Sequence, residues 1–251
     1  MKFPKELLLV KDKESDLLKL KCKLGNKYVS FIVDSGSDTT QVSLQTVMEC
    51  GLVNRIGILS EEDAKDYKPS LIGLLDAALV CHGNVVIHTT MFVNESTPLL
   101  LGMDVLHNYH CSVRMSNTRP TLVVRPSYID NIFMGPSPTM MCQVGQNVVK
   151  VIIDSGSTCS TMNPKIQNHL NIKVQEMEPI TIINPGTNGN IHTQIKYKIE
   201  NAPVTLSGTT KLIDIFLHDW HEDLLLGLDF LTGMELTFVD LDTVIVRKLR
   251  E

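Results

Sequence analysis

The sequence lacks the long apolar runs that membrane-spanning and secreted chains carry. No stretch approaches the roughly 18 apolar residues of a membrane-spanning helix. Near the N-terminus the longest apolar stretch is residues 7–10, which is too short for the core of a signal peptide. We therefore expect a soluble protein with no membrane partner, located in the cytoplasm or, as an alternative, in the nucleus.

The chain also lacks an excess of basic charge and a dense set of cysteines. Its net charge is -5, its pI is near 5.9, and its Lys and Arg residues are scattered, which argues against a nucleic-acid partner. The six cysteines in 251 residues include no CxxC pair and make no disulfide framework. We expect reduced, mostly buried thiols, and neither a metal nor a cofactor.

Two short apolar segments of the chain end in the same four residues, Asp-Ser-Gly-Ser. They are residues 31–37 and residues 151–157. A carboxylate at the end of an apolar strand is costly to bury unless it is hydrogen-bonded or paired. The repetition therefore suggests that Asp34 and Asp154, which lie 120 positions apart, face each other.

Other landmarks repeat in the same order along the chain. The offset of 120 positions also relates Cys22 to Cys142, and a Leu-Leu-Gly element recurs at an offset of 125, in residues 100–106 and 225–231. Several landmarks in one order indicate a duplicated domain, with five residues fewer in the first copy.

The two copies meet in a stretch of turn-forming residues. Pro and Gly concentrate between Pro126 and Pro138, as is typical of a linker. We therefore predict copy one at residues 1–126 and copy two at residues 127–251.

Each copy is predicted to be mainly β. In copy one, short segments rich in Val, Ile and Thr and separated by turn residues predict strands at residues 17–23, 28–33, 74–80, 85–93 and 121–124. Helical spacing is confined to residues 44–50 and 103–109 of copy one, and to residues 164–170 and 228–233 of copy two.

The combination of these motifs resembles the retropepsin family of aspartic proteases. In each copy an Asp-Ser-Gly closes an apolar strand, and two aliphatic residues and a Gly open a short helix 68 positions after Asp34 and 73 positions after Asp154. Residues 31–37, 50–52, 99–106 and 110–113 are more similar to the retropepsin-like domain of the Ddi-type (DNA-damage-inducible) proteins than to viral retropepsins. No ubiquitin-like segment flanks the repeats, so we do not transfer the shuttle role of those proteins.

The resemblance implies an all-β fold of two tandem retropepsin-like barrels related by a pseudo-twofold axis. Retropepsins bring two catalytic acids together by homodimerisation, whereas this chain would supply both acids itself. We expect a monomer with an intramolecular pseudo-dimer, and a homodimer paired in trans as the alternative assembly.

By the same resemblance, Asp34 and Asp154 would be the catalytic pair of an aspartic endopeptidase acting on protein or peptide substrates. Two carboxyl groups in contact share one proton. The ionised member would take a proton from water, while the protonated member would hydrogen-bond the scissile carbonyl. The active-site loops would be supported by hydroxyls that bond the opposite lobe and by glycines that admit substrate, at Ser35, Gly36, Ser155 and Gly156.

The two copies are expected to hold substrate differently. The hairpin that closes over substrate in this family would have its tip at residues 185–190 of copy two, where glycines suit a mobile turn. Copy one has acidic residues 60–66 there instead, so we predict a single working flap. At the 120 offset, copy two has Thr158 in the position where copy one has Asp38. The predicted substrate-binding residues are Ser37, Asp38, Ser157, Thr158, Gly186 and Gly189.

Three alternatives compete with this interpretation. The fold could serve as a catalytically inactive scaffold that binds protein partners, because fold does not determine function. The stretches at residues 107–111 and 218–223 could suggest zinc, but neither has a second ligand pair at zinc-like spacing. Cys159 lies near Asp154 without a positioned base in the sequence, so a packing role is favoured over a nucleophilic one.

Overall fold

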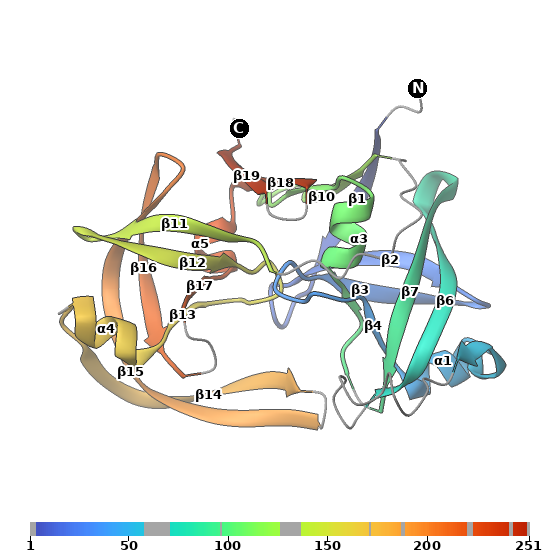
Figure 1. Ribbon diagram of the computed structural model, residues 1–251, viewed down its shortest axis with the longest axis horizontal. Helices are drawn as coiled ribbons and strands as arrows, with labels where there is room; N and C mark the ends of the chain where they lie inside the picture. The colour runs from blue at the N-terminus through green and yellow to red at the C-terminus, as the bar shows by residue number, and fades with distance from the viewer. Residues whose placement is uncertain are drawn as a thin grey trace.

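A computed structural model describes residues 4–57, 71–95, 97–125, 137–170, 172–186, 189–219, 223–240 and 243–249. Within these ranges the side chains of residues 182–186, 189–192 and 240 are not described. The chain is mainly β and contains two closed six-stranded barrels, as expected from the sequence. Figure 1 shows one barrel at each end of the long axis. The predicted boundary between residues 126 and 127 lies outside the described residues.

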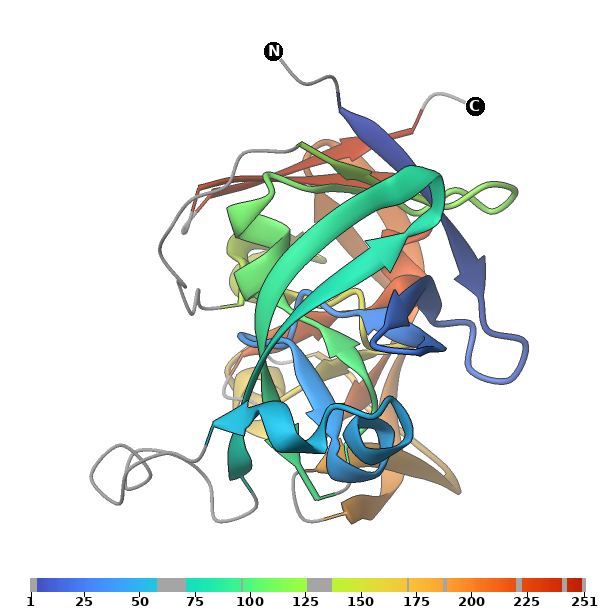
Figure 2. The same ribbon diagram turned by 90° about the vertical axis from the view of Figure 1, so that its right-hand side faces the viewer.

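The copy-one barrel has the strand order β2-β3-β8-β4-β7-β6 and is closed by pairing between β2 and β6. These strands are β2 (Leu18–Leu24), β3 (Lys27–Val33), β8 (Leu100–Leu101), β4 (Gln41–Ser43), β7 (Val85–Asn94) and β6 (Leu71–Cys81). Figure 2 looks onto this barrel, with the long β6–β7 hairpin in front. The short strand β5 (Ile56–Gly57) pairs with the outer edge of β6.

The copy-two barrel repeats this order strand for strand. Its order is β11-β12-β17-β13-β16-β15, closed by pairing between β11 and β15. The strands are β11 (Thr139–Val144), β12 (Asn147–Ile153), β17 (Leu224–Leu226), β13 (Ser160–Met162), β16 (Thr209–Leu217) and β15 (Gly189–Leu206). A further strand, β14 (Gln175–Gly186), forms a long hairpin with β15. The two barrels therefore share one topology, as the repeat predicts.

Alternating polarity explains why these segments form barrel strands. Along β2 every second residue is buried, at Leu18, Leu20, Cys22 and Leu24, and the residues between them include three lysines. Side chains of a strand point alternately to opposite faces, so this pattern supplies one wall of a core and one solvated face.

The helices lie close to where the sequence predicts them. Within the described residues they are α1 (Leu44–Glu49), α3 (Met103–Asn108), α4 (Pro164–Leu170) and α5 (Leu228–Leu231), with short 3-10 turns η1 (Val53–Arg55) and η2 (His82–Asn84). The side chain of Ser43 caps α1 by accepting a bond from the Thr46 N–H at 3.2 Å. Pro164 opens α4, a position where its missing N–H costs nothing. Among the described residues, none of the helices has the length and apolar character to span a membrane.

A shared sheet joins the two copies. Copy one contributes β1 (Lys5–Lys11), β9 (Ser112–Arg114) and β10 (Thr121–Val124), and copy two contributes β18 (Met234–Asp240) and β19 (Thr243–Lys248). Their order is β19-β18-β9-β10-β1. Ser112 of β9 pairs with Thr237 of β18, its own equivalent at the 125 offset, and their hydroxyls lie 3.0 Å apart. Equivalent residues of the two copies therefore meet at this strand pair, as a twofold relation between the copies would require.

Buried side chains of β18 hold the shared sheet against the core. Leu236 is fully buried and pairs with Val113 across the two copies. Arg114 reinforces the junction with ion pairs to Glu235 at 2.8 Å and to Glu6 at 2.7 Å. These pairs are partly exposed and contribute little, so apolar burial dominates the stability of the junction.

The substitution Leu236→Ala should lower the free energy of unfolding by about 2–5 kcal/mol, because it leaves a cavity where the two copies pack together. Leu8 lies on β1 of the same sheet but is 58% exposed. Leu8→Ala should therefore change stability by less than about 0.5 kcal/mol. Urea denaturation of both variants measures the difference, and equal effects would contradict the importance of this contact.

Candidate active site

The two acids of the repeated motif follow equivalent strands. Asp34 follows β3 and Asp154 follows β12. The Asp34 N–H donates to the Leu101 carbonyl at 3.0 Å, and the Asp154 N–H donates to the Leu226 carbonyl at 3.0 Å. Each acid is therefore anchored to the Leu-Leu-Gly element of its own copy, and both loops lie between the two barrels (Figure 1).

The serines of the motif lock the two loops together. The Ser35 hydroxyl donates to the Ile153 carbonyl at 2.9 Å and accepts the Ser155 N–H at 2.9 Å. The Ser155 hydroxyl donates to the Val33 carbonyl at 2.8 Å and accepts the Ser35 N–H at 3.1 Å. Both serines are fully buried. The bonds between hydroxyl and opposite lobe that the resemblance implied are thus present in both directions.

The glycines of the motif bring the two carboxyl groups together. A β-carbon placed on Gly36 would lie 2.5 Å from Cγ of Asp154, and one on Gly156 would collide with the carboxyl group of Asp34. No other residue type fits this approach. The two acids, which we call the acid pair (Asp34 and Asp154), therefore meet within one chain.

Burial and mutual repulsion set the protonation of the acid pair. Burial raises the pKa of Asp34 well above its ordinary value of 3.8, and the charge of Asp154 and a hydrogen bond with its carboxyl group raise it further. The N–H groups of Gly36 and Ser37 oppose this rise by bonding to Asp34. The pair therefore retains a proton at pH values where an isolated Asp has lost it.

The next residues of each loop bond mainly to their own loop. The Ser37 hydroxyl donates to the Thr39 carbonyl, and the Ser157 hydroxyl donates to the Cys159 carbonyl, both at 2.9 Å. Asp38 and Thr158, which follow these serines, are exposed. Ser37 and Ser157 thus support the loop backbone, whereas Asp38 and Thr158 are free of the core and accessible; the substrate-binding roles of all four stay a prediction.

Ser137 adds a contact that breaks the symmetry. Its hydroxyl donates to the Gly36 carbonyl at 2.8 Å and lies 3.3 Å from Oδ1 of Asp38. It precedes β11, and the Pro138 carbonyl accepts the Ile153 N–H at 2.9 Å. The start of copy two therefore runs alongside the acid pair and covers part of the copy-one loop.

A second pair of carboxylates supports the loops from beneath. The Thr40 hydroxyl donates to Asp104 at 2.7 Å and accepts the Gly102 N–H at 3.1 Å. In copy two the Ser160 hydroxyl donates to Asp229 at 2.7 Å and accepts the Gly227 N–H at 3.1 Å. We did not predict these networks. The sequence nevertheless contained a signal for them. The two acids lie 125 positions apart and the two hydroxyl residues lie 120 positions apart, which are the offsets of the repeat.

The predicted flap of copy two coincides with the tip of the β14–β15 hairpin. The strands pair as far as Gly186 opposite Gly189. In Figure 1 this hairpin extends from the copy-two barrel toward copy one, on the opposite side of the molecule from β18 and β19. Residues 60–66, where we predict an acidic stub in copy one, lie outside the described residues, so the single working flap stays a prediction.

The residues of the competing interpretations have other environments. His107 packs edge-on against Phe238 with ring centroids 5.7 Å apart, and a ring nitrogen of His110 lies 3.1 Å from the Val239 carbonyl. Part of the stretch at residues 218–223 lies outside the described residues. Burial raises the pKa of Cys159 to about 11, which disfavours a reactive thiolate there.

Removing one cross-lobe hydroxyl should destabilise the fold. Ser155→Ala would leave the Ser35 N–H and the Val33 carbonyl buried without a partner, at a cost of about 1–3 kcal/mol for each group. Ser155→Thr keeps the hydroxyl and should restore most of the stability. Thermal denaturation of the two variants checks this, and an alanine variant as stable as the threonine variant would contradict the role of the bond.

The buried Asp104 should make stability depend on pH. Burial raises its pKa from 3.8 to about 6, so the folded state binds a proton more tightly than the unfolded state. The stability that this group contributes is therefore present below pH 3.8 and is lost as the pH rises through 6. Asp104→Asn keeps an acceptor for Thr40 without the charge. It should be more stable than the wild type by up to about 3 kcal/mol at pH 7.5, with the difference vanishing near pH 3.5.

Urea denaturation across this pH range measures the difference. The exposed Glu14 supplies a matched control, since Glu14→Gln should show no comparable trend. A stability difference for Asp104→Asn that grows toward acid pH would contradict the prediction.

Comparison with protein-family models finds no match to the chain, and none of the curated proteins matches it. The function is therefore inferred from the geometry of the acid pair and its supporting loops.

Proposed function

We propose that the chain is a single-chain, retropepsin-like aspartic endopeptidase that hydrolyses peptide bonds with the acid pair. The observation that carries the proposal is the contact between Asp34 and Asp154, held by two serine hydroxyls exchanged between the barrels. A turn at the end of a strand does not require a second acid from a distant segment, nor glycines that fit against the opposite carboxyl group. An acid pair that shares one proton does require both.

Catalysis would depend on the shared proton. The ionised carboxylate accepts a proton from a water molecule as the water oxygen attacks the scissile carbonyl carbon. The protonated carboxyl group donates to the carbonyl oxygen, which gives a neutral tetrahedral intermediate. When the C–N bond breaks, the leaving nitrogen takes a proton from the pair, and a hydroxyl group of the intermediate returns a proton to it. The products are an amine and a carboxylic acid, and the pair is again singly protonated.

The surroundings of the acid pair support a peptide as the substrate. The β14–β15 hairpin extends toward copy one and presents backbone that an extended peptide could bond. On the copy-one side, Ser137 already bonds the Gly36 carbonyl. Substrate would therefore be held mainly by copy two and by the exposed side chains of Asp38 and Thr158.

The proposal predicts a bell-shaped pH dependence of kcat/KM, measured with a peptide library between pH 3 and pH 8. Activity falls in acid when both carboxyl groups are protonated, and it falls again when both are ionised. The raised pKa of Asp34 places this second decline above 3.8. Asp34→Asn should lose at least about 10³-fold in kcat/KM at every pH.

Glu14→Gln should retain the activity of the wild type, since Glu14 is exposed and takes no part in the site. Turnover that persists in folded Asp34→Asn would contradict the mechanism. If the folded wild type cleaves no peptide anywhere in this range, the inactive scaffold becomes the better interpretation.

A further inference from the structure

Two cysteines of copy one face each other where its barrel closes. Cys22 on β2 and Cys81 on β6 are direct partners in the antiparallel pairing that joins the first and last strands of the barrel. Directly opposed residues of antiparallel strands have Cα atoms about 4.5–5.5 Å apart. That separation falls within the roughly 4.4–6.8 Å that disulfides span. The backbone of the closed barrel therefore already has the spacing of a disulfide.

The two thiols are in contact with each other. A hydrogen bond between them raises the pKa of Cys22 and lowers that of Cys81, while burial opposes ionisation of both. Of the two thiols, Cys81 is therefore the more readily ionised, and its Sγ also lies 3.9 Å from the Leu79 carbonyl. A thiolate is the form that attacks an oxidant.

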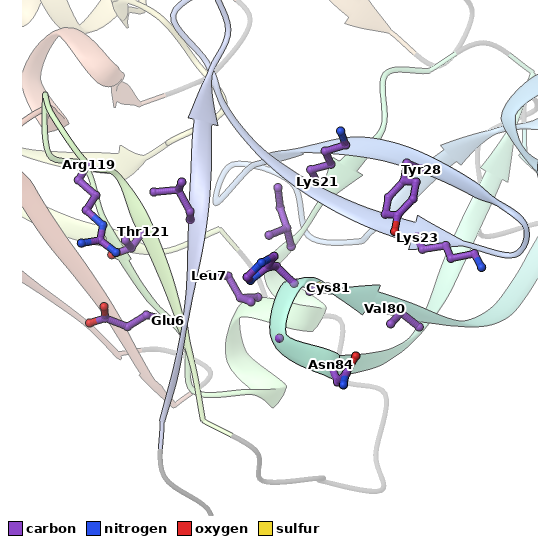
Figure 3. A pocket seen from close by; sticks show the side chains of 14 residues that line it. Glu6, Leu7, Lys21, Lys23, Tyr28, Val80, Cys81, Asn84, Arg119 and Thr121 are labelled. Carbon is purple, nitrogen blue, oxygen red and sulfur yellow. The ribbon is translucent and has the colours of Figure 1, made fainter.

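Only one of the two cysteines lines a pocket. A pocket of about 760 Å³ lies between β1, β2 and the β6–β7 turn, and Cys81 forms part of its wall whereas Cys22 does not. Figure 3 shows Cys81 among its lining residues, between Leu7 and Val80. The pocket therefore adjoins Cys81 and not Cys22, although both cysteines are almost fully buried.

The residues that line this pocket favour a polar or anionic ligand. Lys21, Lys23 and Arg119 contribute positive charge. The acid Glu6 also lines it, but its carboxylate pairs with Arg114 at 2.7 Å. A hydroperoxide, which is small and polar, fits this entrance.

We propose that Cys22 and Cys81 form a redox-sensitive pair that a hydroperoxide converts to a disulfide across the seam of the copy-one barrel. The Cys81 sulfur attacks the peroxide, the O–O bond breaks, and Cys81 becomes a sulfenic acid as water or an alcohol leaves. The Cys22 sulfur then attacks the Cys81 sulfur, and the S–S bond forms as the S–OH bond breaks and a second water leaves. Two thiols are oxidised, and the peroxide is reduced.

The pair belongs to one copy only. At the offsets of the repeat, the equivalent of Cys22 is Cys142, but the equivalent of Cys81 is Leu206. Copy two therefore provides an internal control, with one buried cysteine on the equivalent strand and no partner for it. The inference does not depend on whether the chain is a protease.

The test treats the full chain with hydrogen peroxide and counts free thiols after denaturation. The untreated protein has six, and the oxidised protein should have four, with peptide mapping that links Cys22 to Cys81. Dithiothreitol should restore six. The oxidised protein should also unfold at a higher temperature than the reduced protein, because the bond constrains the unfolded chain.

Variants identify the order of attack. Cys142→Ser should lose two thiols on oxidation as the wild type does, whereas Cys22→Ser should form no internal disulfide and should leave Cys81 as a sulfenic acid that a cyclic diketone traps. Retention of six thiols by the peroxide-treated wild type would overturn the proposal. So would a disulfide that links Cys50 or Cys111 in place of either partner. The wild-type mapping decides this even if a serine variant fails to fold.

Discussion

The centre of this molecule depends on two serine hydroxyls exchanged between the barrels. Carboxyl groups in contact repel each other when ionised, so an acid pair must be held together by bonds elsewhere. Ser35 and Ser155 supply them, since each hydroxyl donates to a carbonyl and accepts an N–H of the opposite loop. Because these groups are buried, water cannot replace a lost partner. Neither copy can therefore satisfy the hydrogen-bonding groups of its own acid-pair loop without the other.

Around this contact, the groups that hold the loops in place are the same in both copies, whereas the surroundings of the loops differ. The hydroxyl–carboxylate networks of Asp104 and Asp229 are equivalent, because the same loop must be held against the same Leu-Leu-Gly element. The residues around the loops do not have to hold this element, so they can differ between the copies. Ser137 covers the copy-one loop alone, and the described β14–β15 hairpin belongs to copy two. Because both copies belong to one chain, their sequences can differ in this way, whereas the two subunits of a symmetric homodimer are identical.

The repeated parts of this structure could be predicted from the sequence, but the contacts that join the two copies could not. Offsets of 120 and 125 positions predicted the paired loops and the equivalent barrels, because each landmark was confirmed by a second copy. Residues 164–170 were predicted as a helix and form α4, since Pro164 marks its start. The pairing of β9 with β18 was not predicted, because alternating polarity identifies a strand but not its partner. Ser137 was missed because it lies in a linker and has no counterpart in the repeat.

Because the two copies can differ in sequence, a redox-sensitive pair can exist in one barrel while the loops of the acid pair are alike in both. If the two barrels were identical chains, a cysteine at position 81 would recur in both, and oxidation would join both seams together. Here one seam has Cys22 opposite Cys81, whereas its counterpart combines Cys142 with Leu206. A disulfide would fasten only the barrel that carries Asp34, on strands that lie outside the loop of the acid pair. Oxidation would then stabilise one half of the molecule while the four hydroxyl bonds between the loops remain as they are.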